Sequence, residues 1–228
     1  MYASGAAAPC PMRRSGSTGP DGTNIGSRTA AARSQGRFVR VGIAARVRSV
    51  ALDQPPTLGD GDCEALRDSW LGQPVNTVTS IGYVAVGAWL GARSSRLPRD
   101  QRPSAVTYAG LVALTGIGSV AYHGPQFPGA QMLHDAPIFA AAAVGAAVPL
   151  SRLARGRRAL PGWSNRAGVA IGVCGALGLV AYAAGRTGSP LCRPQSVLQP
   201  HGIWHLATAA VIGLWGSVIW APETAVDG

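Results

Sequence analysis

Hydrophobic residues are distributed very unevenly along the 228-residue chain. From Gln73 onward, five apolar stretches follow one another, separated by short polar segments. They cover residues 75–92, 104–122, 133–150, 167–184 and 202–220. Each stretch is close to the ~20 residues that a helix needs to cross ~30 Å of hydrocarbon. The pattern therefore predicts an all-α membrane protein, a bundle of about five transmembrane helices.

The polar segments define the expected domains. Residues 1–60 are rich in Gly, Ser, Ala, Pro and Arg and lack apolar periodicity, which indicates a disordered tail. This tail has no uninterrupted apolar core of a signal peptide, and we expect translation to start between Val41 and Asp60. Residues 61–221 form the membrane domain, and residues 222–228 form a short tail. A soluble bundle of buried helices is disfavoured because only 13% of the residues are charged.

The net charge of +10 comes entirely from arginine, and its distribution argues against nucleic-acid binding. Eight of the twenty arginines lie in the first fifty residues. Nine lie in the loops after the first and third apolar stretches, and only three lie on the opposite side. Positive loops between membrane spans face the cytoplasm. We therefore expect the other ends of the helices to face outward from a bacterial plasma membrane.

Small residues recur at four-residue spacing within the apolar stretches, as in Gly87 with Gly91 and Gly168 with Gly172. This spacing allows helices to approach closely in lipid. A glycine-rich composition of 31 glycines explains the same spacing without any packing role, and the sequence does not separate these alternatives.

Ionisable residues inside membrane spans are costly and are usually functional. All four histidines lie at the outward-facing ends of apolar stretches, and Asp135 is the only carboxylate that enters such a stretch. The histidines are His123, His134, His201 and His205. Because five spans alternate in direction, the predicted topology brings these residues to one face of the bilayer.

The spacing of the polar residues predicts a metal site. Ser119 and His123 are four residues apart and share a helix face, as do His201 and His205. Two histidines on one face with a third from another helix give three imidazoles and an open position, the pattern of a catalytic zinc site. Each element alone has a simpler explanation, namely coincidence, interfacial packing or helix capping. His134 has no such partner, and we expect it at the membrane interface.

Five motifs, in this order, resemble the alkaline ceramidase family in its bacterial form. This family belongs to a superfamily of membrane hydrolases and receptors that includes the adiponectin receptors. The motifs are D-C-E (62–64), Q-P-V-N-T (73–77), G-I-G-S-V-A-Y-H (116–123), L-H-D-A-P (133–137) and H-G-I-W-H (201–205). The similarity covers residues 60–220 and is carried by the ordered set rather than by any single motif.

The resemblance implies specific roles. Zinc would be held by His123, His201 and His205, with Ser119 and Asp135 beside the metal. A disulfide would join Cys63 to Cys192 on the outward-facing side, where disulfides persist. Cys174 is expected to be a buried free thiol, and Cys10 lies in the tail.

The chain also departs from the family. The eukaryotic members have seven helices, and losing two between Asp135 and the last histidine pair keeps both on one side. Those members bind calcium through acidic residues before the first helix. Here the acidic residues are Asp60, Asp62, Glu64 and Asp68. Gln73 and Leu66 replace two family ligands, so calcium is a weaker expectation and a solvated acidic surface is the alternative.

The resulting hypothesis is a zinc-dependent amidohydrolase that cleaves a ceramide-like or other N-acyl lipid. Asp135 would take a proton from water and pass it to the leaving amine, and Ser119 would hydrogen-bond the oxyanion. The alternative is a zinc-stabilised membrane receptor or scaffold with little or no turnover, because the superfamily contains such members. The sequence does not distinguish amide from ester hydrolysis.

Overall fold

The computed structural model describes residues 58–221, and these residues form five α-helices with no named strand. The helices are α1 (Pro74–Ser94), α2 (Arg102–His123), α3 (Ala130–Ala154), α4 (Asn165–Ala184) and α5 (Pro200–Ile219). Each coincides with a predicted apolar stretch to within a few residues, so the expected five-helix fold is confirmed. The two tails and Cys10 lie outside the described residues.

Proline and local caps determine where the helices begin. α1, α2 and α5 each carry proline in the first helical turn, where its missing N–H costs no hydrogen bond. The Ser164 hydroxyl accepts from the Ala167 N–H and caps α4. α3 begins after Gly129, which adopts a left-handed conformation with φ of 92°. Asp135 therefore lies inside α3 and does not cap it.

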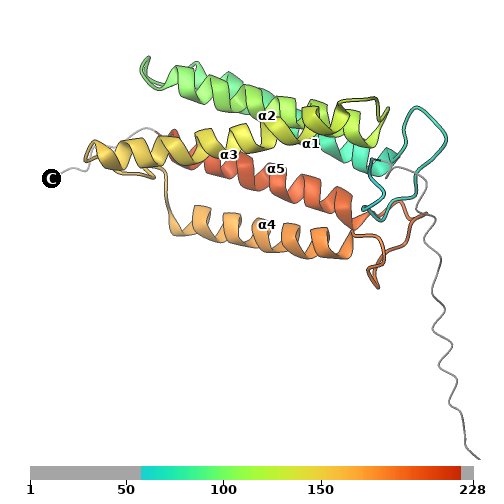
Figure 1. Cartoon of the computed structure of the whole chain (residues 1–228). Helices are drawn as coiled ribbons and strands as arrows, with labels where there is room; N and C mark the ends of the chain where they lie inside the picture. The colour runs from blue at the N-terminus through green and yellow to red at the C-terminus, as the bar shows by residue number, and fades with distance from the viewer. Residues whose placement is uncertain (1–57, 222–228) are drawn as a thin grey trace, which may run out of the picture. The chain divides into compact units, whose positions relative to one another are not determined.

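Neighbouring contacts link the helices in the order α3, α2, α1, α5, α4, and Figure 1 shows the five helices lying lengthwise alongside one another. α1 contacts both α2 and α5 extensively, and α2 contacts α3. Among the described helices, α4 contacts only α5, and α3 touches α5 at few positions. The chain thus leaves α3 and α4 without mutual contact.

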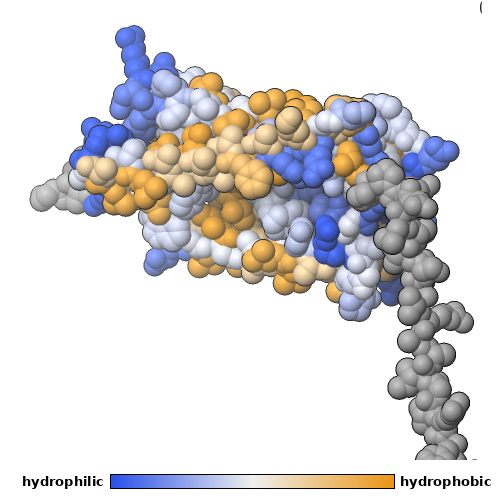
Figure 2. All heavy atoms as spheres, in the orientation of Figure 1, coloured by the Kyte–Doolittle hydropathy of each residue, from blue (hydrophilic) through white to orange (hydrophobic). Residues whose placement is uncertain are grey.

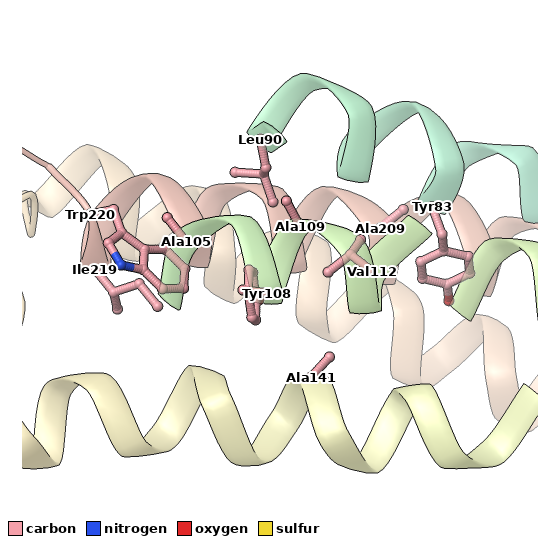
Figure 3. Packing of buried hydrophobic residues seen from close by; sticks show 10 residues of the cluster. All are labelled: Tyr83, Leu90, Ala105, Tyr108, Ala109, Val112, Ala141, Ala209, Ile219 and Trp220. Carbon is pink, nitrogen blue, oxygen red and sulfur yellow. The ribbon is translucent and has the colours of Figure 1, made fainter. Parts of the chain in front are cut away.

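An apolar core forms where α1, α2, α3 and α5 converge, and Figure 3 shows its side chains gathered around α2. Val112 and Ile219 are fully buried within it. The Tyr108 and Trp220 rings pack with their centroids 5.0 Å apart. Burial of such aromatic and aliphatic surface positions α2 against the other helices.

Four of the helices, α2 to α5, are long and apolar enough to cross a membrane. α1 is less apolar than the other four helices because its first turns carry polar side chains, namely Asn76, Thr77, Thr79 and Ser80. Large apolar side chains such as Phe139 and Val180 are exposed on the outer surfaces, and Figure 2 shows apolar bands along the helices. These features indicate an integral membrane protein. That α1 also spans the membrane remains a prediction.

The two ends of the bundle differ in chemistry. The arginine-bearing α1–α2 and α3–α4 loops lie at one end, and the four histidines lie at the other. At the histidine end, a disulfide joins Cys63, before α1, to Cys192, before α5, with a Cα–Cα distance of 5.3 Å. The expected pairing is confirmed. Cys174 is a free thiol, but it is half-exposed rather than buried, because α4 packs on one side only.

The small-residue spacing has different consequences in α1 and α4. A Cβ on Gly87 would lie 2.6 Å from the Ala113 backbone nitrogen, so this glycine permits close α1–α2 packing. A Cβ on Gly172 would meet nothing within 4 Å, and one on Gly168 would meet Trp163, just before the same helix. The packing role is therefore confirmed at Gly87 and is wrong for the pair in α4.

Candidate metal centre and adjoining cavity

Three buried histidines converge at one end of the bundle. One ligand nitrogen from each of His123, His201 and His205 lies within 4.8 Å of the other two. His123 ends α2, and the other two occupy successive turns at the start of α5. No more than 6% of any of these residues is exposed. The fold thus brings together the three predicted zinc ligands from two separate helices.

Gln73 orients the first of these histidines. Its Oε1 lies 2.6 Å from His123 Nδ1. Because an amide oxygen only accepts, Nδ1 carries the proton and donates it, which leaves Nε2 with a free lone pair. The Gln73 amide nitrogen donates to the carbonyl oxygens of Gly59 and Glu64 at 3.0 and 2.8 Å. The loop before α1 therefore determines the tautomer of His123.

A main-chain carbonyl orients the second histidine. Nδ1 of His205 lies 3.2 Å from the Asn76 carbonyl oxygen. The Ser80 and Thr79 hydroxyls lie 3.3 and 3.2 Å from the same nitrogen. Both hydroxyls also donate to carbonyl oxygens of α1. The first turns of α1 thus form a polar support behind His205, again leaving Nε2 for a ligand.

A buried carboxylate faces the third histidine. Asp62 Oδ1 lies 3.3 Å from His201 Nδ1, but the contact is too poorly aligned to be a hydrogen bond. His201 Nδ1 has no hydrogen-bond partner among the residues that the structure describes. The same oxygen accepts from Arg186 Nη1 at 2.7 Å. Desolvation raises the pKa of Asp62 to about 6, against the lowering effect of Arg186. A cation held by His201 would favour the charged carboxylate.

The donor set fits zinc. Each Nδ1 faces an oxygen acceptor on the protein, and histidines that bind zinc usually donate their second N–H to such a group. Three neutral imidazoles at one point match the ligands of catalytic zinc sites with an open position. Sequence reasoning missed the roles of Gln73, Asp62 and Asn76. Only their places in the D-C-E and Q-P-V-N-T motifs marked them.

Asp135 lies near this centre but outside the three-histidine group. Its Oδ1 is 2.6 Å from His134 Nδ1, which donates to the carboxylate. Both residues line the cavity beside the histidines, and the Asp135 side chain is 43% exposed. His134 is not part of the three-histidine group and contacts its neighbour Asp135 instead, and its place at the membrane interface remains a prediction. Adjacent residues on one helix turn form this pair, which sequence spacing alone does not reveal.

Ser119 lies behind the histidines rather than at the cavity. It is 1% exposed, is not among the cavity-lining residues, and its Oγ is 2.8 Å from Ser80 Oγ. Ser80 donates its only hydroxyl hydrogen to Asn76 O, so Ser119 donates to Ser80. Its predicted contact with an oxyanion would require this hydroxyl to rotate, and that role remains a prediction.

Two of the acidic residues before α1 have structural partners. Glu64 accepts from the N–H groups of Val75 and Asn76, both at 2.8 Å, and so caps the start of α1. Asp62 pairs with Arg186. Within residues 58–221, the three histidines are the one group arranged to hold a metal. The weaker calcium expectation therefore gains no support from this loop.

A cavity of about 710 Å³ adjoins the histidines. It runs along α3 and α5 toward the middle of the bundle, and its histidines, carboxylates and arginine lie at the histidine end. In Figure 2, hydrophilic residues lie between the apolar bands toward that same end. Such a volume is typical of small-molecule sites, which are mostly apolar with few polar groups.

Comparison of the chain with models of protein families, with curated proteins and with solved structures finds no match. Function is therefore inferred from the residues of the site.

Proposed function

We propose that this protein is a zinc-dependent integral-membrane hydrolase that cleaves the amide bond of an N-acyl lipid. The observation that carries the proposal is the arrangement of His123, His201 and His205, whose Nδ1 atoms face protein oxygens at the end of an apolar cavity. An open zinc position beside a lipid-sized cavity suits hydrolysis of a lipid. The arginine-poor location of the centre favours the outer face of a plasma membrane.

The chain contributes proton transfer and orientation. When bound, zinc polarises a carbonyl and lowers the pKa of its water toward ~7. Asp135 accepts the proton of the attacking water and transfers it to the leaving nitrogen as the C–N bond breaks, giving a carboxylic acid and an amine. His134 holds this carboxylate through the 2.6 Å contact. Gln73 and Asn76 keep His123 and His205 in the ligand-binding tautomer, and the Asp62 carboxylate lies beside His201 Nδ1.

The test combines metal analysis with product analysis. The purified, detergent-solubilised protein should contain about one zinc per chain, as expected for a three-histidine site. Incubation with a mixture of N-acyl lipids should release a free fatty acid detectable by mass spectrometry, and chelation should stop the release. A metal-free preparation that hydrolyses the lipids at the full rate would refute the proposal. Including matched acyl esters distinguishes amide from ester hydrolysis.

A zinc-stabilised receptor or scaffold is the second candidate, and one observation favours it. α2 and α5 touch at few positions, so a cation held by His123 and the α5 histidines would add a direct link between them. Asp135→Asn separates the candidates. In an enzyme it should lower turnover by about 10²–10⁴ without loss of zinc. In a scaffold the variant should behave as wild type.

A further inference from the structure

We propose that the cavity holds a single acyl chain that enters between α3 and α4, and that Tyr108, Gly145 and Trp215 close its inner end and limit the chain length. This inference rests on the proposed lipid hydrolase and specifies which part of the substrate the protein selects.

The cavity has the depth of one leaflet. Its lining runs on α3 from Gln131 to Ala146 and on α5 from His201 to Trp215. The ten residues from Asp135 to Gly145 span about 15 Å of helix, which is half of the ~30 Å hydrocarbon core. A chain whose head group lies at the histidines would therefore end near the middle of the bilayer.

The walls change from polar to apolar along this path. The histidines, carboxylates and Arg186 lie at the outer end, and small and aliphatic side chains form much of the deeper wall. The small and aliphatic residues include Ala141, Ala142, Val211 and Ile212. The hydroxyls of the deeper wall are bonded within the protein: Tyr83 to Thr208, Tyr108 to the Ile212 carbonyl oxygen, and Thr115 to the Leu111 carbonyl oxygen. A hydrocarbon chain with one polar end is the ligand that matches this gradient, because burying further polar groups along the deeper wall would leave them unpaired.

Three residues close the inner end. Trp215 Nε1 donates to the Gly145 carbonyl oxygen at 3.1 Å and so links α5 to α3. A Cβ on Gly145 would lie 3.2 Å from Tyr108 Cε2 and 3.3 Å from Trp215 Nε1, so both rings pack directly against this glycine. Beyond Tyr108 lies a second, smaller cavity of about 180 Å³, lined partly by arginines. Tyr108 therefore separates the two cavities.

The open side of the cavity faces the membrane. α3 and α4 make no contact within the described chain, yet Tyr182 of α4 and eight residues of α3 line the cavity. α3 and α4 both carry apolar surfaces long enough to lie in lipid. An acyl chain can thus enter sideways from the bilayer without crossing water. A lipid is favoured over a second protein chain because the opening leads to this mostly apolar cavity with polar groups at its outer end.

Two neighbouring alanines on α3 provide a matched test. Ala142 lines the cavity, whereas Ala143 does not, and both are exposed to the membrane side. Each is replaced by leucine, and the purified variants are incubated with a mixture of saturated free fatty acids of graded length. The fatty acids that remain bound are measured by mass spectrometry.

Ala142→Leu should shift the bound chains to shorter lengths and weaken binding of the longest wild-type chain about tenfold, because about two methylenes lose their place. Ala143→Leu should leave the wild-type profile unchanged. Trp215→Ala should shift the profile toward longer chains by removing part of the closed end. Equal profiles for the two leucine variants would overturn the inference, whatever the Trp215 variant does.

The measurement also separates the inference from the proposed function, because binding is measured without turnover. A shifted profile in a protein that hydrolyses no lipid would retain the acyl-chain site and refute the hydrolase. Hydrolysis with identical chain-length profiles in both leucine variants would retain the hydrolase and refute the site.

Discussion

Two regions of the molecule differ in how closely their helices pack. In the contact region, α1 packs against α2 and α5, whereas a gap separates α3 from α4. In the contact region, Gly87 lets α1 and α2 meet backbone to backbone, and polar side chains of α1 support His205. Across the gap, α4 touches only α5 and its Gly172 meets nothing. Close packing holds the histidines in position, whereas α3 and α4 do not meet. In the proposed hydrolase, different helices would therefore provide site precision and substrate access.

The largest expected effect distinguishes His123, which lies in the contact region, from His134, which lines the cavity. His123→Ala should abolish stoichiometric metal binding, because it removes one of three imidazoles. His134→Ala should retain the metal, since His134 contacts Asp135 and is not part of the three-histidine group. Elemental analysis of both purified variants checks this. Equal metal loss in the two would contradict the assigned ligands.

The next effect concerns helix packing. Gly87→Ala should destabilise the fold by about 3 kcal/mol, at the upper end for overpacking, because the new methyl group would meet backbone atoms of α2. Gly172→Ala is the matched control on α4. It should be neutral or stabilise by up to about 1 kcal/mol, since alanine favours helix and the added Cβ meets nothing. Thermal unfolding in detergent measures both, and similar losses would show that the two regions pack alike.

A smaller effect is expected from the orienting amide. Gln73→Ala should weaken zinc binding about 10–100-fold, because His123 Nδ1 loses its acceptor while all three ligands remain. Competition with a chelator of known affinity gives the change. Gln126→Ala is a suitable control. The Gln126 amide donates to the carbonyl oxygen of Leu58, which lies in the loop before α1 as Gln73 does, and it contacts no histidine among the described residues. An unchanged affinity in the Gln73 variant would remove the role assigned to this residue.

The smallest effect is expected at Ser119. If it only supports His205 through Ser80, Ser119→Ala and Ser80→Ala should both lower turnover by less than about tenfold, in keeping with a lost neutral hydrogen bond. A direct contact with the oxyanion would instead make the Ser119 variant lose about 10²–10³ in kcat. Steady-state kinetics on both variants therefore decides between support and catalysis.

The sequence alone determined the helices and the end of the bundle at which the histidines lie. Hydrophobic length is a local property matched to bilayer thickness, and the number of crossings fixes which helix ends share a side. This was sufficient to group His123 with the α5 pair before any coordinates. The Cys63–Cys192 pairing came from the family resemblance, and it is present in the structure.

Tertiary structure decided which atoms face each histidine and which residues line the cavity. Gln73 and Asp62 reach the site because the loop before α1 folds back over the helix ends, a path that no periodicity encodes. Ser119 turns toward Ser80 because the α1–α2 contact sets the rotation of α2 about its axis. Helical spacing places a residue on a face, but only the packing of neighbouring helices determines what that face meets.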